Sequence, residues 1–201
     1  MSTRSDDVKE AAASAIKNKK NLEKHVADLS GSSRRERQSS AAVIAAVAKE
    51  CPDKLVPHLA DIMDALNRPE AQTRWEVLDA LTELVPLDAR TCDKALVGAE
   101  TALFDEDSGP LRLAAMRFLC TFGATTENRS EKVWPLIDEG IQCYHGDLEF
   151  HDMLGGVISF SAGKLSPTVK EELAARMKFD ADNGKGQLKK LATQIEDNLA
   201  K

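Results

Sequence analysis

The chain has 201 residues and a formal net charge of −6, an acidic balance that does not suit a protein whose main partner is nucleic acid. Only 4% of the residues are aromatic, alanine and leucine are abundant, and no stretch alternates β-branched and polar residues, so the composition predicts an all-α fold. The longest uncharged apolar run, residues 41–48, is too short to cross a membrane, and we expect no membrane partner.

Residues 1–19 predict an N-terminal capping helix that covers the apolar side of the first repeat. Ser5 is a suitable N-cap residue, and Asp6 and Asp7 favour the positive end of a helix dipole. The side that can cover the next helices carries Val8, Ala12 and Ile16. The start MSTRSDDVKE has no apolar segment behind its charges, so we expect no signal peptide and a cytoplasmic protein.

Residues 55–85 predict two consecutive amphipathic helices. Pro69 separates them, because proline suits the first turn of a helix and interrupts its interior. In each half the apolar residues recur at helical spacing, which predicts one buried stripe per helix. These stripes consist of Leu59, Ile62, Met63 and Leu66, and of Val77, Ala80, Leu81 and Leu84.

The same two-helix unit recurs with a period in the high thirties. When Arg74 serves as the anchor, its counterparts in the other copies are Arg37, Arg112 and His151. The apolar positions keep their distance from the anchor in every copy, which one amphipathic helix alone would not show. We therefore predict four repeats within residues 20–165, with helix breakers at the joints, over 20–51, 54–87, 92–123 and 130–163.

Residues 166–201 predict C-terminal capping helices. One helix starts at Ser166-Pro167, and a second follows the flexible connector 182–186. The apolar side of this last helix must be covered by the preceding repeat, by a second copy of the chain, or by a partner. We favour capping of its own chain, which predicts a monomer, or a weak homodimer through the C-terminal helix.

Short motifs in both helices of the repeated unit resemble HEAT repeats. Leu55-Val56-Pro57-x-Leu59 and Val133-Trp134-Pro135-Leu136 resemble the first helix of that family, and Arg74…Ala80-Leu81 and Arg112-Leu113-Ala114-Ala115 resemble its second helix. The resemblance covers about residues 20–165, and with the capping helices on either side we predict one domain over residues 1–201. Its expected fold is a right-handed α-α superhelix, an armadillo-like solenoid of about four two-helix repeats with capping helices.

Trp75, Asp79 and Arg112 carry a fainter resemblance, to the HEAT-like-repeat alkylpurine DNA glycosylases, which strip damaged bases with a Trp/Asp pair and an Arg. It implies that Asp79 stabilises the cationic sugar, Arg112 holds a phosphate and Trp75 contacts the damaged nucleotide. Against this alternative, DNA binders commonly neutralise about 6–10 phosphates. Of the sixteen positions expected on the concave side, only Arg117 is basic. We expect no nucleic-acid partner.

No metal or cofactor site is predicted. The cysteines, at positions 51, 92, 120 and 143, have no close pairs, and we expect them to be reduced. Cys143, His145, Asp147, His151 and Asp152 lie close in sequence, but the Gly146-Asp147 turn falls between them and their spacing matches no zinc pattern.

The remaining feature is the expected concave surface, which is mostly small and apolar. We predict a non-enzymatic protein-interaction or scaffold module whose partner, an unidentified protein, presents a peptide or a helix to this surface. The predicted contact residues are Trp75, Leu78, Leu113, Met116 and Arg117. In an equally weighted alternative, these side chains pack between adjacent second helices and do not reach solvent.

Overall fold

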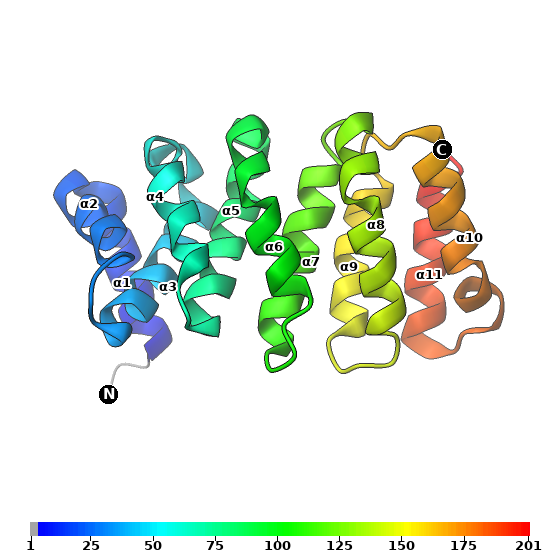
Figure 1. Cartoon of the computed structure of the whole chain (residues 1–201), viewed down its shortest axis with the longest axis horizontal. Helices are drawn as coiled ribbons and strands as arrows, with labels where there is room; N and C mark the ends of the chain where they lie inside the picture. The colour runs from blue at the N-terminus through cyan, green and yellow to red at the C-terminus, as the bar shows by residue number, and fades with distance from the viewer. Residues whose placement is uncertain (1–3) are drawn as a thin grey trace. The chain divides into compact units, whose positions relative to one another are not determined.

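The structure is a computed structural model that describes residues 4–201, and it is built from helices arranged in antiparallel pairs (Figure 1). No strand occurs in this described range, so the all-α fold class is confirmed. The α-helices are α1 (Arg4–Lys17), α2 (Lys19–Asp28), α3 (Arg34–Glu50), α4 (Leu59–Asp64), α5 (Ala71–Cys92), α6 (Leu96–Leu103), α7 (Gly109–Gly123), α8 (Glu127–Cys143), α9 (Phe150–Ser161), α10 (Pro167–Asn183) and α11 (Gly186–Leu199).

The contacts of the chain group it into two compact units, the first ending at Ala102 and the second running over Leu103–Lys201. Each unit is described by itself below, and the single domain expected from the sequence stays a prediction. No helix between residues 4 and 201 combines the length and the apolar character that a membrane span requires.

In the first unit, α1, α3 and α5 pack side by side, and α2 and α4 cover them. The α3 helix buries small side chains on this side, including Ala41, Ala45 and Ala48. Small residues let two helix backbones approach closely, so α3 and α5 can pack along their length. Ala12 and Ala15 of α1 are buried, while Val8 and Ile16, also expected to cover the repeat, are half-buried.

The α5 helix contains a kink at its C-terminal end. Pro86 interrupts the hydrogen-bonding pattern, and Asp88 has non-helical backbone angles of φ −148° and ψ 67°. The Asp88 carboxylate accepts a hydrogen bond from the backbone N–H of Thr91 at 3.0 Å, as an N-cap residue does. The second helix of repeat two was predicted to end at residue 87, and the kink lies at that place.

In the second unit, α7, α9 and α11 pack in the same manner, with α8 packed on α7 and α10 on α11. Phe118, Phe122 and Phe160 are fully buried here. Gly123 allows a close approach of helices, because a Cβ atom at this position would lie 2.5 Å from the Val133 side chain and 2.7 Å from the ring of Phe160. The core of this unit therefore depends on large rings fitted around a position without a side chain.

The last helix, α11, covers α9 and α10 of its own chain. Ala192 and Ile195 are fully buried, and the Asn198 side-chain amide donates to the Ile158 carbonyl at 3.2 Å and to the Ser161 hydroxyl at 3.1 Å. These two bonds attach the C-terminal end of α11 to the last turn of α9. Covering by its own chain was the alternative favoured from the sequence, and association through α11 stays a prediction.

Candidate functional site

The arginine that marks the repeat in the sequence ties consecutive helix pairs together in the first unit. Arg37 of α3 donates from Nε to Oε2 of Glu70 at 3.1 Å, and its Nη2 contacts the other oxygen of the same carboxylate. Its Nη1 donates to the carbonyls of Gly31 and Ser32, at 2.8 and 3.0 Å, in the turn before α3. Because Glu70 is the N-cap residue of α5, the guanidinium joins one interhelical turn to the start of the next second helix.

The ion pair is almost closed to solvent, since the exposed fractions of the Arg37 and Glu70 side chains are 12% and 5%. The hydrogen bonds from Arg37 hold the pKa of the Glu70 carboxyl below its usual value. Bidentate pairing of this kind also fixes orientation. We conclude that the repeat anchor has a structural role at position 37.

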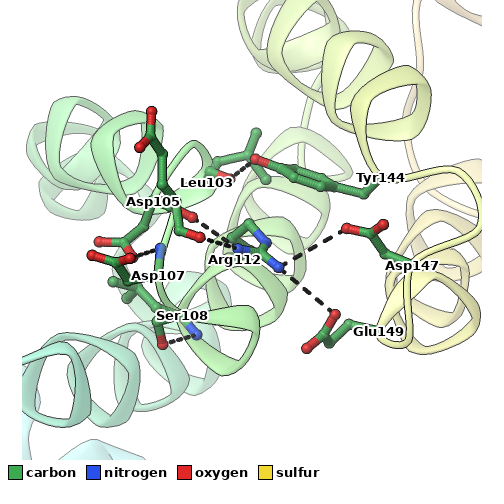
Figure 2. A network of polar contacts seen from close by, with 10 residues as sticks. Leu103, Asp105, Asp107, Ser108, Arg112, Tyr144, Asp147 and Glu149 are labelled. Atoms are coloured by element: carbon green, nitrogen blue, oxygen red, sulfur yellow. Dashed lines mark hydrogen bonds and ion pairs between the residues drawn. The ribbon is translucent and has the colours of Figure 1, made fainter.

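Arg112 of α7 makes the corresponding contacts in the second unit (Figure 2). Its Nη1 donates to the Asp105 carbonyl at 2.9 Å, and its Nη2 lies 4.0 Å from the Asp147 carboxylate and 3.9 Å from that of Glu149, the N-cap residue of α9. The guanidinium carbon lies 5.0 Å from the centre of the Tyr144 ring. In the glycosylase alternative Arg112 holds a phosphate, which stays a prediction, and in the structure carbonyl and carboxylate oxygens lie around this cation.

Two of the five predicted contact residues, Leu78 and Met116, are fully buried. A Cβ atom at Gly140 would lie 2.6 Å from Cε of Met116, so this methionine packs tightly against α8. Leu78 and Met116 are therefore closed to solvent, and packing between adjacent second helices stays a prediction. Register separates these residues from the others. The side chain is buried four residues after the anchor, whereas one and five residues after it the side chain reaches the surface.

The exposed part of α5 brings an aromatic ring and two carboxylates together in the first unit. Trp75, Glu76 and Asp79 are all half-buried on this helix, within one turn of each other. Burial raises the pKa of Glu76, and the neighbouring Asp79 carboxylate raises it further. Hydrogen bonds from Trp75 and Gln72 stabilise the charged form of Glu76 and act in the opposite direction. This group, Trp75, Glu76 and Asp79, is called the Trp75 surface below.

Glu76 was not among the residues singled out from the sequence. Its position three residues before Asp79 places both carboxylates on one side of a helix, which was a usable signal. The Trp/Asp pair considered in the sequence includes Asp79 and does not include Glu76. The raised pKa of Glu76 depends on burial, which the sequence pattern does not show.

In the second unit, the remaining two predicted contact residues lie on α7, where Leu113 is half-buried and Arg117 is exposed. The neighbouring α9 carries Gly155 and Gly156, and the Cα atom of Arg117 would lie 3.6 Å from a Cβ atom at Gly156. A Cβ atom at Gly155 would meet nothing within 4 Å. On α9 these two positions therefore present no side chain, and Arg117 on the neighbouring α7 is exposed.

The residues that were considered and rejected as a metal site make other contacts. His145 lies 3.2 Å from both carboxylate oxygens of Asp180, and its ring centre lies 4.8 Å from that of Phe150. Across residues 4–201 no three His, Cys, Asp or Glu side chains are grouped as a metal ion would require. Within the same range the four cysteines are free thiols, with Cys143 exposed and Cys120 buried.

Comparisons with known proteins identify the fold. No protein-family model matches the chain, and no curated protein matches it. Among solved structures, a designed armadillo repeat protein in complex with the peptide (KR)4 has a TM-score of 0.78 at 13% identity, covering 96% of this chain and 90% of that one. Computationally designed armadillo repeat proteins for modular peptide recognition give a TM-score of 0.75 at 14% identity, covering 96% of this chain and 90% of that chain.

A further designed armadillo repeat protein has a TM-score of 0.72 at 14% identity, covering 98% of this chain and 92% of that chain. At these identities the likeness shows the fold alone. The repeat α-solenoid expected from the sequence is thus confirmed, and no family match supports the similarity to DNA glycosylases. The chain has the armadillo-like repeat fold.

Proposed function

We propose that this protein is a non-enzymatic repeat scaffold that binds an extended peptide, and that the Trp75 surface holds a lysine or arginine side chain of that peptide. The observation that carries the proposal is the grouping of one indole ring with two carboxylates, Glu76 and Asp79, on the accessible part of α5. Of the contact residues predicted from the sequence, we retain Trp75 in the first unit, and Leu113 and Arg117 in the second.

The chemistry of the group favours a cation. A guanidinium or ammonium over an indole ring gains about 0.5–2 kcal/mol, depending on how far it is desolvated. A carboxylate beside the ring adds a charge-assisted hydrogen bond. The crowding of Glu76 and Asp79 raises the pKa of Glu76, and a bound cation would relieve this repulsion.

Two further facts support a basic peptide. The net charge of −6 attracts cationic segments over a distance set by the ionic strength. A protein of the same fold, though only 13% identical, was solved with the peptide (KR)4. Repeat scaffolds of one fold have many different functions. We therefore use this similarity only to choose the basic peptide that serves as the probe.

Isothermal titration with the peptide (Lys-Arg)4 at low salt tests the proposal. We expect Trp75→Ala to weaken binding by about 2- to 30-fold, which corresponds to the range of cation–π energies. Asp79→Asn should weaken it as well, because the ion pair is lost. Glu83→Gln is the matched control, since Glu83 is an exposed carboxylate on the same helix.

The control peptide (Gln-Ala)4 should not bind. If Trp75→Ala and Asp79→Asn bind (Lys-Arg)4 as tightly as the Glu83→Gln variant does, the Trp75 surface is not the binding site. If the unmodified chain does not bind the basic peptide at low salt, the proposed partner chemistry is wrong.

A further inference from the structure

The first unit contains a groove of about 390 Å³ between the short 3-10 helix η3 (Ala65–Asn67) and α6. Its floor includes Met63, Leu66 and Gly98. A Cβ atom at Gly98 would lie 2.9 Å from Cδ1 of Leu66, so the glycine lets the Leu66 side chain pack closely against α6 at the edge of the groove. The volume of the groove lies within the range of common ligand sites.

The charge of the groove is opposite to that of the protein. Arg68, Arg74 and Lys94 line it, and none of its described lining residues is acidic. The other grooves described on this unit each include an aspartate or a glutamate, such as Asp61 or Asp7. The Asp64 carboxylate beside the groove pairs with Arg68, while Lys94 is exposed at the groove, so in a chain with a net charge of −6 this lining has more cations than anions.

The guanidinium of Arg68 is held at the rim of this groove by one carboxylate. Its Nη2 donates to the Asp64 carboxylate at 2.8 Å, an exposed pair four residues apart on one helix turn. Its Nε atom is buried and has no hydrogen-bond partner within residues 4–201. Because Nε is closed to solvent, an anion in the groove can reach Arg68 only through the Nη groups of its guanidinium.

The groove also offers an apolar contact. Val97 lines it and is 75% exposed, so an aliphatic surface is available to a ligand beside the cations. Met63 is half-buried on the opposite side, and its flexible thioether adapts to varied ligand shapes. A site for a free inorganic anion would not need these two side chains.

We infer that this groove binds an acidic segment of a partner protein, in which a carboxylate contacts Arg68 and Lys94 and a neighbouring aliphatic side chain covers Val97. This surface is called the Lys94 groove. It is distinct from the Trp75 surface, and the two take peptides of opposite charge. The inference does not depend on the proposed function, because none of the Trp75, Glu76 and Asp79 side chains lines the groove.

Fluorescence anisotropy with a labelled (Glu-Leu)4 peptide tests the inference on the full chain, with (Gln-Leu)4 as the uncharged probe. We expect Lys94→Gln to weaken binding by about two- to fivefold, the range for one accessible ion pair. Val97→Ser should weaken binding while leaving its salt dependence unchanged, because it removes apolar contact only. Lys54→Gln, which removes an exposed lysine outside the groove, should bind as the unmodified chain does.

Three outcomes would overturn the inference. The first is equal binding of (Glu-Leu)4 and (Gln-Leu)4, and the second is equal loss in the Lys54→Gln and Lys94→Gln variants. The third is displacement of the peptide by low concentrations of inorganic phosphate together with no effect of Val97→Ser, which would identify a small-anion site. Trp75→Ala should leave (Glu-Leu)4 binding intact, so failure of this inference and failure of the proposed function are separate results.

Discussion

Arg37 and Glu70 form an ion pair between residues 33 positions apart, with Nε of the guanidinium 3.1 Å from Oε2 of the carboxylate. The pair connects α3 to the N-cap residue of α5, and the same guanidinium also donates to the turn that precedes α3. A single side chain therefore joins the turn before one second helix to the start of the next second helix.

We expect Arg37→Met to lower the melting temperature clearly more than Arg34→Met does. The Arg37 change leaves the Glu70 carboxylate buried without its cation, which is a costly state. Arg34 is exposed on the same turn of α3, and its replacement should shift the melting temperature by less than about 2 °C. Thermal unfolding followed by circular dichroism measures both variants. The double variant Arg37→Met/Glu70→Leu should recover much of the loss, and equal melting of both single variants would contradict the role of the pair.

The pH dependence of stability should contain a contribution from His25. Burial lowers the pKa of this imidazole below its usual 6.5, and the adjacent Lys24 lowers it further, whereas Asp28 acts in the opposite direction. Because the folded state takes up a proton less readily than the unfolded state, the free energy of unfolding should fall as the pH drops below about 6.5. Urea unfolding across this range should show a weaker decrease in His25→Gln. Ser40, whose hydroxyl lies 3.0 Å from Nδ1, can bond the amide instead.

Glu76→Gln should stabilise the protein at neutral pH. The pKa of Glu76 is raised, so its charged form is less stable in the folded state than in the unfolded state. Removing the repulsion between Glu76 and Asp79 is worth about 0.2–0.5 kcal/mol on a helix surface. The gain should disappear below about pH 4, where the glutamate is protonated in both states. Urea titrations at the two pH values compare the variant with the unmodified chain, and a loss of stability at pH 7 would refute this interpretation.

Two glycines on the neighbouring helices α7 and α9 should respond to alanine in opposite ways. Gly123→Ala places a methyl group against Val133 and Phe160 in the core and should cost about 1–3 kcal/mol. Gly155→Ala adds a methyl group where nothing lies within 4 Å and should gain about 0.5–1 kcal/mol through helix propensity. Chemical denaturation measures both, and destabilisation by Gly155→Ala would mean that this face of α9 is covered.

Much of the fold could be predicted from the sequence, because helical periodicity is local. The apolar stripes of residues 55–85 are recognisable without knowledge of their partners, and the break before α5 follows from Pro69. The sequence register also identified the recurring arginine. Its role could not be read in this way, because the carboxylates that it contacts lie about one repeat later in the chain, at Glu70 for Arg37 and at Glu149 for Arg112.

The candidate site was predicted only in part, because a helical repeat does not specify how far each helix is rotated toward its neighbour. A small rotation of the helix about its axis changes which side chains are exposed and which are packed. On α5 it leaves Trp75 half-buried and Leu78 buried. The Lys94 groove could not be predicted for another reason. It joins residues from η3, from the short 3-10 helix η4 (Asp93–Ala95) and from α6, which share no sequence motif.

The two tryptophans have different surroundings, so their fluorescence can be used to follow unfolding without an added label. Trp134 is buried, stacks on Phe160 with ring centres 6.4 Å apart and donates to Glu172, while Trp75 is partly open to solvent. One indole belongs to each compact unit. The emission of Trp75→Phe and of Trp134→Phe should therefore report the melting of the second and of the first unit separately, and iodide should quench chiefly the Trp75 signal.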